Sequence, residues 1–319
     1  MPLASPILWA TISFPRPVTK STASRSAGVH AGLDCPRWRL AGGIFGYSRV
    51  LSRRGRRRSG TLSAALISFP VCLRLLAQTD QALADSSAAG VGLAAYAQRN
   101  FVAAQAHYRE APGEATAAWK FARACFDVAD LATNNTERAF MAEQGIAAGQ
   151  QALARESNSA PAHYYLGMNL GQLARTKGLT ALSLVLQMQR EFSRAHDLEE
   201  QLDWAGPDRN LGLLYRDAPA IASIGSRTKA REHLTRAVEL APQYPENRLN
   251  LIEAYLQWGE PNNARRELTA LEEAWPSART NFVGEAWAAN WADWEPRLKK
   301  LKQKVEAPKK SLGTPRTQP

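Results

Sequence analysis

A 34-residue period, marked by proline, runs through the C-terminal half of the sequence. Pro242 and Pro276 lie 34 residues apart, and the segment between them is typical of two amphipathic helices joined at Gly259. Its apolar residues recur at spacings of three and four, the period of a helix with one buried face. Proline lacks an N–H group, so we expect each proline to end a helix. Such units fold as an array in which neighbouring pairs bury each other's apolar faces.

The same pattern recurs upstream, and glycine stands where two helices of a pair must approach closely. Units begin near Trp119, at Ala160 and at Gly206, and a weaker half-unit precedes them. Gly167 and Gly212 have no Cβ atom, which allows close helix contact. The pattern predicts four to five helix pairs between residues 88 and 278.

Two turns and the C-terminal segment depart from the regular period. Residues 130–136 and 217–226 lengthen the turns of their units, and insertions of this kind form loops on one side of an array. The segment 282–305 places Trp287, Trp291 and Trp294 on one helical face. We expect it to be a capping helix, because the last pair of an array leaves an apolar face uncovered.

The unit that starts at Pro245 resembles the tetratricopeptide repeat family. Leu251 and Tyr255 take the leucine and tyrosine places of its first helix, whereas Ile252 stands where the family prefers glycine. The stretch 203–247 has a narrower resemblance, to the T-component family of TRAP transporters, and a similar layout occurs in the regulator of microtubule dynamics family. These resemblances imply an all-α, tetratricopeptide-type α-solenoid that is exported and serves as a binding module beside other proteins. They bring no catalytic residue.

The net charge of +11 is confined to the first 78 residues, which hold twelve Lys or Arg residues and one acid, Asp34. The rest of the chain is balanced, so nucleic-acid binding lacks its main electrostatic support. A basic run at 53–58, an apolar stretch at 62–71 and small residues up to Ala77 follow the order of a secretory signal peptide. We therefore expect an unstructured leader with a signal-peptide-like segment near 53–77 (residues 1–84), a solenoid (85–306) and a disordered basic tail (307–319). The predicted location is periplasmic or exported, with cytoplasmic as the alternative, and contact of the basic tail with a membrane surface stays open.

The sequence contains no Walker loop, no Rossmann glycine fingerprint, no G-x-S-x-G elbow and no H-E-x-x-H motif. Cys125 is the one cysteine after the leader, and a lone thiol in a helix is more often core filler than a nucleophile. His196, Glu199 and Glu200 form at most a minimal metal cluster, for which a solvated helix end is the favoured interpretation. We expect that the protein is not an enzyme and that it binds no cofactor and no metal.

The predicted helix 179–200 carries two apolar stripes where a repeat needs one. Leu179, Leu182 and Leu186 form the second stripe, which is either covered by the loop 217–226 or exposed as an interaction surface. The candidate ligand or partner surface comprises Leu179, Leu182, Leu186, Tyr215, Ile221, Ile224, Trp287 and Trp291. The expected function is non-catalytic binding of a protein or peptide partner in the concave groove. The alternative is binding of a small apolar ligand or lipid as an accessory subunit of a TRAP-type transport system, and a homo-oligomer stays open.

Overall fold

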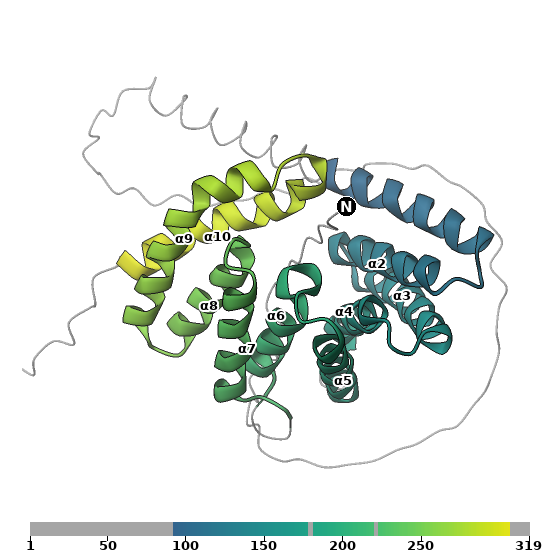
Figure 1. The fold of residues 1–319 in the computed structure, drawn as a ribbon, viewed down its shortest axis with the longest axis horizontal. Coiled ribbons are helices and arrows are strands. Elements are labelled where there is room, and N and C mark those ends of the chain that lie inside the picture. Colours follow the sequence, from purple (N-terminus) through teal and green to yellow (C-terminus); the bar gives the residue numbers. More distant parts are fainter. Residues whose placement is uncertain (1–91, 178–180, 220–222, 307–319) are drawn as a thin grey trace, which may run out of the picture. The chain divides into compact units, whose positions relative to one another are not determined.

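The computed structural model describes residues 92–177, 181–219 and 223–306, and within these ranges the chain is helical without strands. Figure 1 shows the helices following one another in sequence order. A helix over residues 92–110 comes first. It is followed by α2 (Ala115–Leu131), α3 (Asn135–Arg155), α4 (Ala160–Lys177), α5 (Leu182–Leu198), α6 (Leu202–Asp217), α7 (Arg227–Leu240), α8 (Pro245–Gln257), α9 (Pro261–Asn281), the 3-10 helix η2 (Glu285–Trp287) and α10 (Ala288–Glu306).

Four helix pairs make up the array: α2 with α3, α4 with α5, α6 with α7, and α8 with α9. The predicted glycine contacts lie within two of them. A Cβ atom on Gly167 would stand 2.6 Å from Cε1 of Phe192, and one on Gly212 would stand 2.6 Å from Cγ of Leu234. The all-α, tetratricopeptide-type prediction is confirmed, and so is the number of pairs. The predicted leader and tail lie outside the described residues. Leu179 and Ile221, in two short internal gaps, also lie outside them.

The buried apolar side chains form two large clusters that meet at α6. The first includes residues from the helix 92–110 and from α2 to α7, and the second extends to α10. Leu211 and Leu214 of α6 belong to the first cluster, whereas Leu213 belongs to the second. One helix therefore contributes to both parts of the core.

The long turn predicted at residues 130–136 is wrong, because α2 continues to Leu131 and α3 begins at Asn135. Asn134 caps α3: its Oδ1 atom accepts a hydrogen bond from the Glu137 N–H at 2.8 Å. Such a cap satisfies an N–H group that the helix cannot pair itself, so only three residues are needed between the helices.

The predicted helix end at Pro276 is also wrong, since α9 passes through this residue to Asn281. Proline removes one backbone hydrogen bond of a helix. Beyond it, Ala278 and Phe282 are both buried in the second cluster, and we attribute the continuation of the helix to this burial.

The predicted single helix over 282–305 is broken near its start. Gly284 has φ +93°, a left-handed backbone that favours glycine, and η2 and α10 follow it. The tryptophans of this segment face the core: Trp294 is fully buried, and the indole N–H of Trp291 donates to the Phe282 carbonyl at 2.6 Å. Across the described helices, none combines the length and the apolar character needed to cross a membrane.

Candidate functional site

A left-handed turn precedes the regular part of α6. Asp203, Trp204 and Ala205 have φ values of 50°, 59° and 62°, although none of them is glycine. Each such residue costs about 1–2 kcal/mol, because its Cβ atom crowds the following carbonyl oxygen. The turn therefore persists only because its surroundings hold it, and strain of this kind clusters at functional sites.

The buried Arg209 guanidinium holds this turn in place. Its Nη1 donates to the Trp204 carbonyl at 3.1 Å, and its Nη2 donates to Oδ2 of Asp203 at 3.1 Å. The Tyr164 hydroxyl donates to the same carboxylate oxygen at 2.8 Å, and the Asn247 amide donates to the Trp204 carbonyl at 3.1 Å. Burial raises the pKa of Asp203, and the charge of Arg209 opposes this rise.

A cleft of about 410 Å³ lies beside the turn, and we call it the Trp204 cleft. The Trp119 and Tyr165 rings in its wall are stacked at 6.0 Å, and the Trp204 ring is stacked on Tyr244 at 5.8 Å. These stacking contacts fix the aromatic walls. The cleft is lined by Trp119, Pro161, Tyr165, Glu199, Gln201, Leu202, Asp203, Trp204, Leu240, Ala241 and Gln243.

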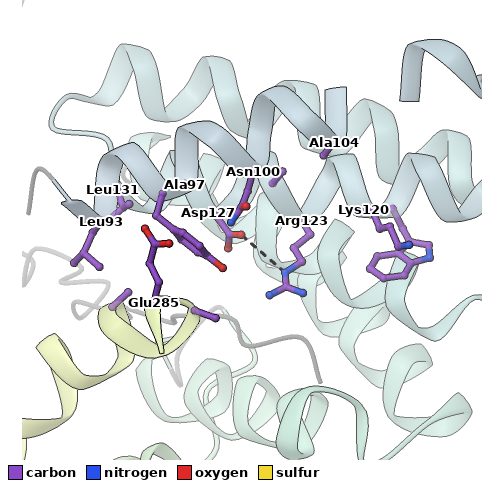
Figure 2. Close-up of a pocket in the computed structure, with 14 residues that line it drawn as sticks. Leu93, Ala97, Asn100, Ala104, Lys120, Arg123, Asp127, Leu131 and Glu285 are labelled. Carbon is purple, nitrogen blue, oxygen red and sulfur yellow. Dashed lines mark ion pairs between the residues drawn. The ribbon is translucent and has the colours of Figure 1, made fainter. Parts of the chain in front are cut away.

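A second cavity of about 250 Å³ lies between the helix 92–110, α2 and the segment around η2, and we call it the N-terminal cavity. Figure 2 shows Arg123 and Asp127 on the wall formed by α2, with Glu285 contributed by the C-terminal segment. The cavity is lined by Leu93, Tyr96, Ala97, Asn100, Ala104, Trp119, Lys120, Arg123, Ala124, Asp127, Leu131, Glu285, Ala286 and Ala289.

Arg123 and Asp127 lie close together in the wall of the N-terminal cavity. Nε of Arg123 lies 3.9 Å from Oδ2 of Asp127, too far for a hydrogen bond, and Oδ1 of Asp127 has no hydrogen-bond partner. Burial raises the pKa of Asp127 to about 7, although the charge of Arg123 lowers it. Glu285 forms an ion pair with Arg99. The Lys120 ammonium lies 5.8 Å from the centre of the Trp119 ring.

The polar residues considered in the sequence have other partners. Nδ1 of His196 and of His233 contact the two oxygens of Asp208 at 3.0 and 2.8 Å. Glu200 pairs with Arg236 at 2.7 Å, so His196 and Glu200 do not share a site. Within the described ranges, no group of three or more His, Cys, Asp or Glu side chains could hold a metal ion.

The Cys125 thiol is fully buried, and burial raises its pKa to about 12. It therefore stays protonated at neutral pH, whereas a nucleophilic cysteine needs the thiolate.

The six described residues of the predicted ligand or partner surface have different surroundings. Leu182 and Leu186 on α5 are 39% and 47% exposed in the described chain. Tyr215 is buried, and Ile224 is half-buried against the first cluster. The predicted tryptophans pack in the second cluster, where Trp287 is buried and Trp291 is half-buried.

Sequence reasoning missed the residues that shape both cavities. Asp203, Trp204 and Arg209 stand in the stretch 203–247, but the repeat spacing there predicts only helices and their contacts. Three successive left-handed residues before Gly206 have no sequence signature. Arg123 and Asp127 form an i, i+4 pair, which on most helices lies at the surface.

Comparisons with known proteins found two family matches. A family model described as Regulator of microtubule dynamics protein 1-3 matches residues 75–203, and a tetratricopeptide repeat model matches residues 225–278. A search of curated proteins found no match. The chain therefore contains a domain of the regulator of microtubule dynamics type and, after it, a tetratricopeptide repeat, which supports a protein-interaction scaffold.

Proposed function

We propose that this protein is a non-catalytic scaffold that binds an extended segment of a partner protein in the Trp204 cleft. The observation that carries the proposal is that residues from successive helix pairs form the wall of the cleft. Its residues come from α2, from α4, from the connection between α5 and α6, from the left-handed turn at the start of α6, from the end of α7, and from the connection between α7 and α8. A cleft that crosses successive repeats offers contacts along the length of an extended chain.

The walls of the cleft are also suited to such a partner. Its three aromatic rings are fixed by stacking, and large aromatic surfaces supply much of the energy of protein interfaces. Its turn is held by the buried Arg209, so little ordering remains to be done when a partner binds.

A site-specific photo-crosslinker tests the proposal. Gln201 and Gln243 are exposed and line the cleft, whereas Glu273 is exposed on α9 and lines neither cavity. A photoreactive phenylalanine at either glutamine is expected to give one discrete adduct in cells that produce the protein. The same residue in place of Glu273 is expected to give none. Equal labelling from all three positions, or from none, would contradict the assignment of the cleft.

The second candidate function is that of a small-ligand accessory subunit of a transport system, as the resemblance to TRAP T-components implies. The N-terminal cavity favours it, because an apolar cavity with a few polar groups is typical of small-molecule sites. Native mass spectrometry is expected to show a co-purifying small molecule. A clean apo mass, together with neighbouring genes that encode no permease or solute-binding subunit, would argue against this function.

We also propose that the protein is exported, because residues 53–77 follow the order of a secretory signal peptide. The regulator of microtubule dynamics match starts at residue 75, after the apolar stretch. N-terminal sequencing of the mature protein is expected to give a start shortly after Ala77 or Ala84. Recovery of peptides from residues 53–70 in the mature protein would contradict cleavage.

A further inference from the structure

A carboxylate oxygen in the wall of the N-terminal cavity calls for a hydrogen-bond donor. Asp127 lines the cavity, and its Oδ1 atom is buried without a hydrogen-bond partner in the described chain. Its Oδ2 atom faces Arg123 at 3.9 Å (Figure 2). Nearly all buried polar groups in proteins are hydrogen-bonded, so an unpaired one beside a cavity indicates a donor from outside the chain. Oδ1 can accept a hydrogen bond whether or not the carboxyl group carries a proton.

The size and the wall of the cavity suit a small molecule with an apolar body. A water takes up about 30 Å³ in the liquid, so one water at Oδ1 leaves most of the cavity, about 250 Å³, unfilled. Leu93, Leu131 and several alanines make much of the wall aliphatic, so further waters would find few hydrogen-bond partners there. The volume lies just below the range of about 300–1,000 Å³ that is typical of sites for drug-sized ligands.

The charges of the wall balance, which favours an uncharged ligand. Among the described lining residues, Lys120 and Arg123 are basic, and Asp127 and Glu285 are acidic. Glu285 also forms an ion pair with Arg99. A bound anion would lie beside the Asp127 carboxylate, and a bound cation would lie beside Lys120 and Arg123. Because an uncompensated charge is costly to bury, a neutral donor group fits this wall better than either ion.

We propose that the N-terminal cavity binds a small uncharged alcohol with an apolar body, whose hydroxyl group donates a hydrogen bond to Oδ1 of Asp127. A hydroxyl oxygen also accepts hydrogen bonds, and Asn100 and Lys120 in the wall carry N–H donors. The apolar body lies against the aliphatic part of the wall. The inference rests on the second candidate function, since it treats the cavity as a small-molecule site, and it is independent of the Trp204 cleft.

Isothermal titration calorimetry of the full chain with 3-phenylpropan-1-ol tests the proposal. The methyl ether of this alcohol is the matched ligand, because it keeps the oxygen and the apolar body but has no donor. Saturable binding of the alcohol is expected, and the ether is expected to bind roughly tenfold more weakly, the factor for one hydrogen bond to a carboxylate. The charged counterparts, 3-phenylpropionate and 3-phenylpropan-1-amine, are also expected to bind more weakly than the alcohol.

Three results would overturn the proposal. Equal affinities for the alcohol and the ether would mean that no donor is recognised, although the cavity would still be a small-molecule site. Tighter binding of either charged counterpart would mean that the wall selects a charge. No saturable binding of the alcohol at millimolar concentration would mean that water alone satisfies Oδ1. The second candidate function is tested separately, by native mass spectrometry, so its failure is distinguishable from these results.

Two variants assign the site. Asp127→Val removes the acceptor at similar size, so the alcohol is expected to bind no better than the ether. Ala104→Phe adds a ring to the wall, where Ala104 is half-buried, and is expected to abolish binding of the alcohol. Asp197→Val is the matched control, because Asp197 is exposed on α5 and lines neither cavity.

Circular dichroism confirms that each variant is folded. The comparison of the two ligands in the parent protein needs no variant, so it decides the proposal even if Asp127→Val fails to fold. A continued preference for the alcohol in a folded Asp127→Val, or unchanged binding in Ala104→Phe, would place the alcohol elsewhere and overturn the proposal.

Discussion

Arg209 is the residue on which the local structure most depends. Its guanidinium is fully buried, lies 5.1 Å from the centre of the Tyr244 ring, and pairs with Asp203 inside a strained turn. Removing one partner of a buried ion pair leaves an uncompensated buried charge. The free-energy cost of this charge is larger than the stabilisation that the pair supplied. The same substitution would free the turn to relax.

Arg209→Met is therefore expected to lower the free energy of unfolding by about 3–5 kcal/mol. Urea denaturation followed by circular dichroism measures this loss. Arg236→Met is the matched control, because its ion pair with Glu200 is about half exposed and is expected to contribute nothing measurable. Similar stability of the two variants would mean that Arg209 does not hold the turn.

Glu246 gives a second prediction for a single residue, a pH dependence of stability. It is buried beside the Tyr244 hydroxyl, which donates to Oε2 at 3.2 Å, and burial raises its pKa to about 7 while Arg209 and Arg297 lower it. Between about pH 4.5 and about pH 7 the folded chain keeps this proton and the unfolded chain loses it. Stability from this group is therefore highest below that window and falls as the pH rises through it.

Glu246→Gln removes this titration and keeps an acceptor for Tyr244. The variant is expected to gain stability relative to the parent as the pH rises from about 5 to about 8, by up to about 3 kcal/mol. Urea denaturation series at several pH values measure the difference. A constant difference across this range would show that Glu246 is ionised in the folded protein.

These residues also show why the site was harder to predict than the fold. Repeat spacing places Arg209 on the first helix of a pair but does not say that it turns back to Asp203, because that contact needs the left-handed turn. Asp127 has the same limit. It lines a cavity together with the helix 92–110 and Glu285, and Glu285 is 158 residues away in the sequence.

At the scale of the element, the helix pairs follow from the sequence because local signals decide them. Glycine at close contacts, apolar residues at helical spacing and proline near helix ends all act within one turn or between neighbouring helices. The helix end predicted at Pro276 is wrong because the tendency of proline to end a helix is opposed by the burial of Ala278 and Phe282. This burial prevails, and α9 continues through the proline.

Gly212→Ala tests the packing of one pair. The added Cβ atom would lie 2.6 Å from Cγ and 3.0 Å from the backbone nitrogen of Leu234, so rotation of the leucine side chain alone cannot relieve the overlap. We expect a loss of about 1–3 kcal/mol in the free energy of unfolding. Gly113→Ala is the control, because a Cβ atom there meets nothing within 4 Å. Equal unfolding midpoints for the two variants would contradict the close contact of α6 and α7.

At the scale of the whole molecule, the described chain has two large hydrophobic clusters joined mainly through α6 and α7. In a repeat array each unit contacts mainly its neighbours, so a local defect spreads only as far as adjacent interfaces allow. The ion pair of Arg99 with Glu285 also links the helix 92–110 to η2, but both side chains are about 60% exposed, and such pairs couple weakly.

This arrangement predicts that the two clusters lose stability separately. Trp294 is fully buried against Tyr244, Phe282 and Trp291, so Trp294→Ala is expected to destabilise the second cluster by about 3–5 kcal/mol. Hydrogen exchange followed by mass spectrometry should then speed up in α8, α9 and α10 while α2 and α4 keep their protection. Phe121→Ala in the first cluster is the matched variant and should give the opposite pattern, with faster exchange in α2 and α4. If either substitution raises exchange equally in both clusters, α6 and α7 transmit the defect and the chain unfolds as one cooperative unit.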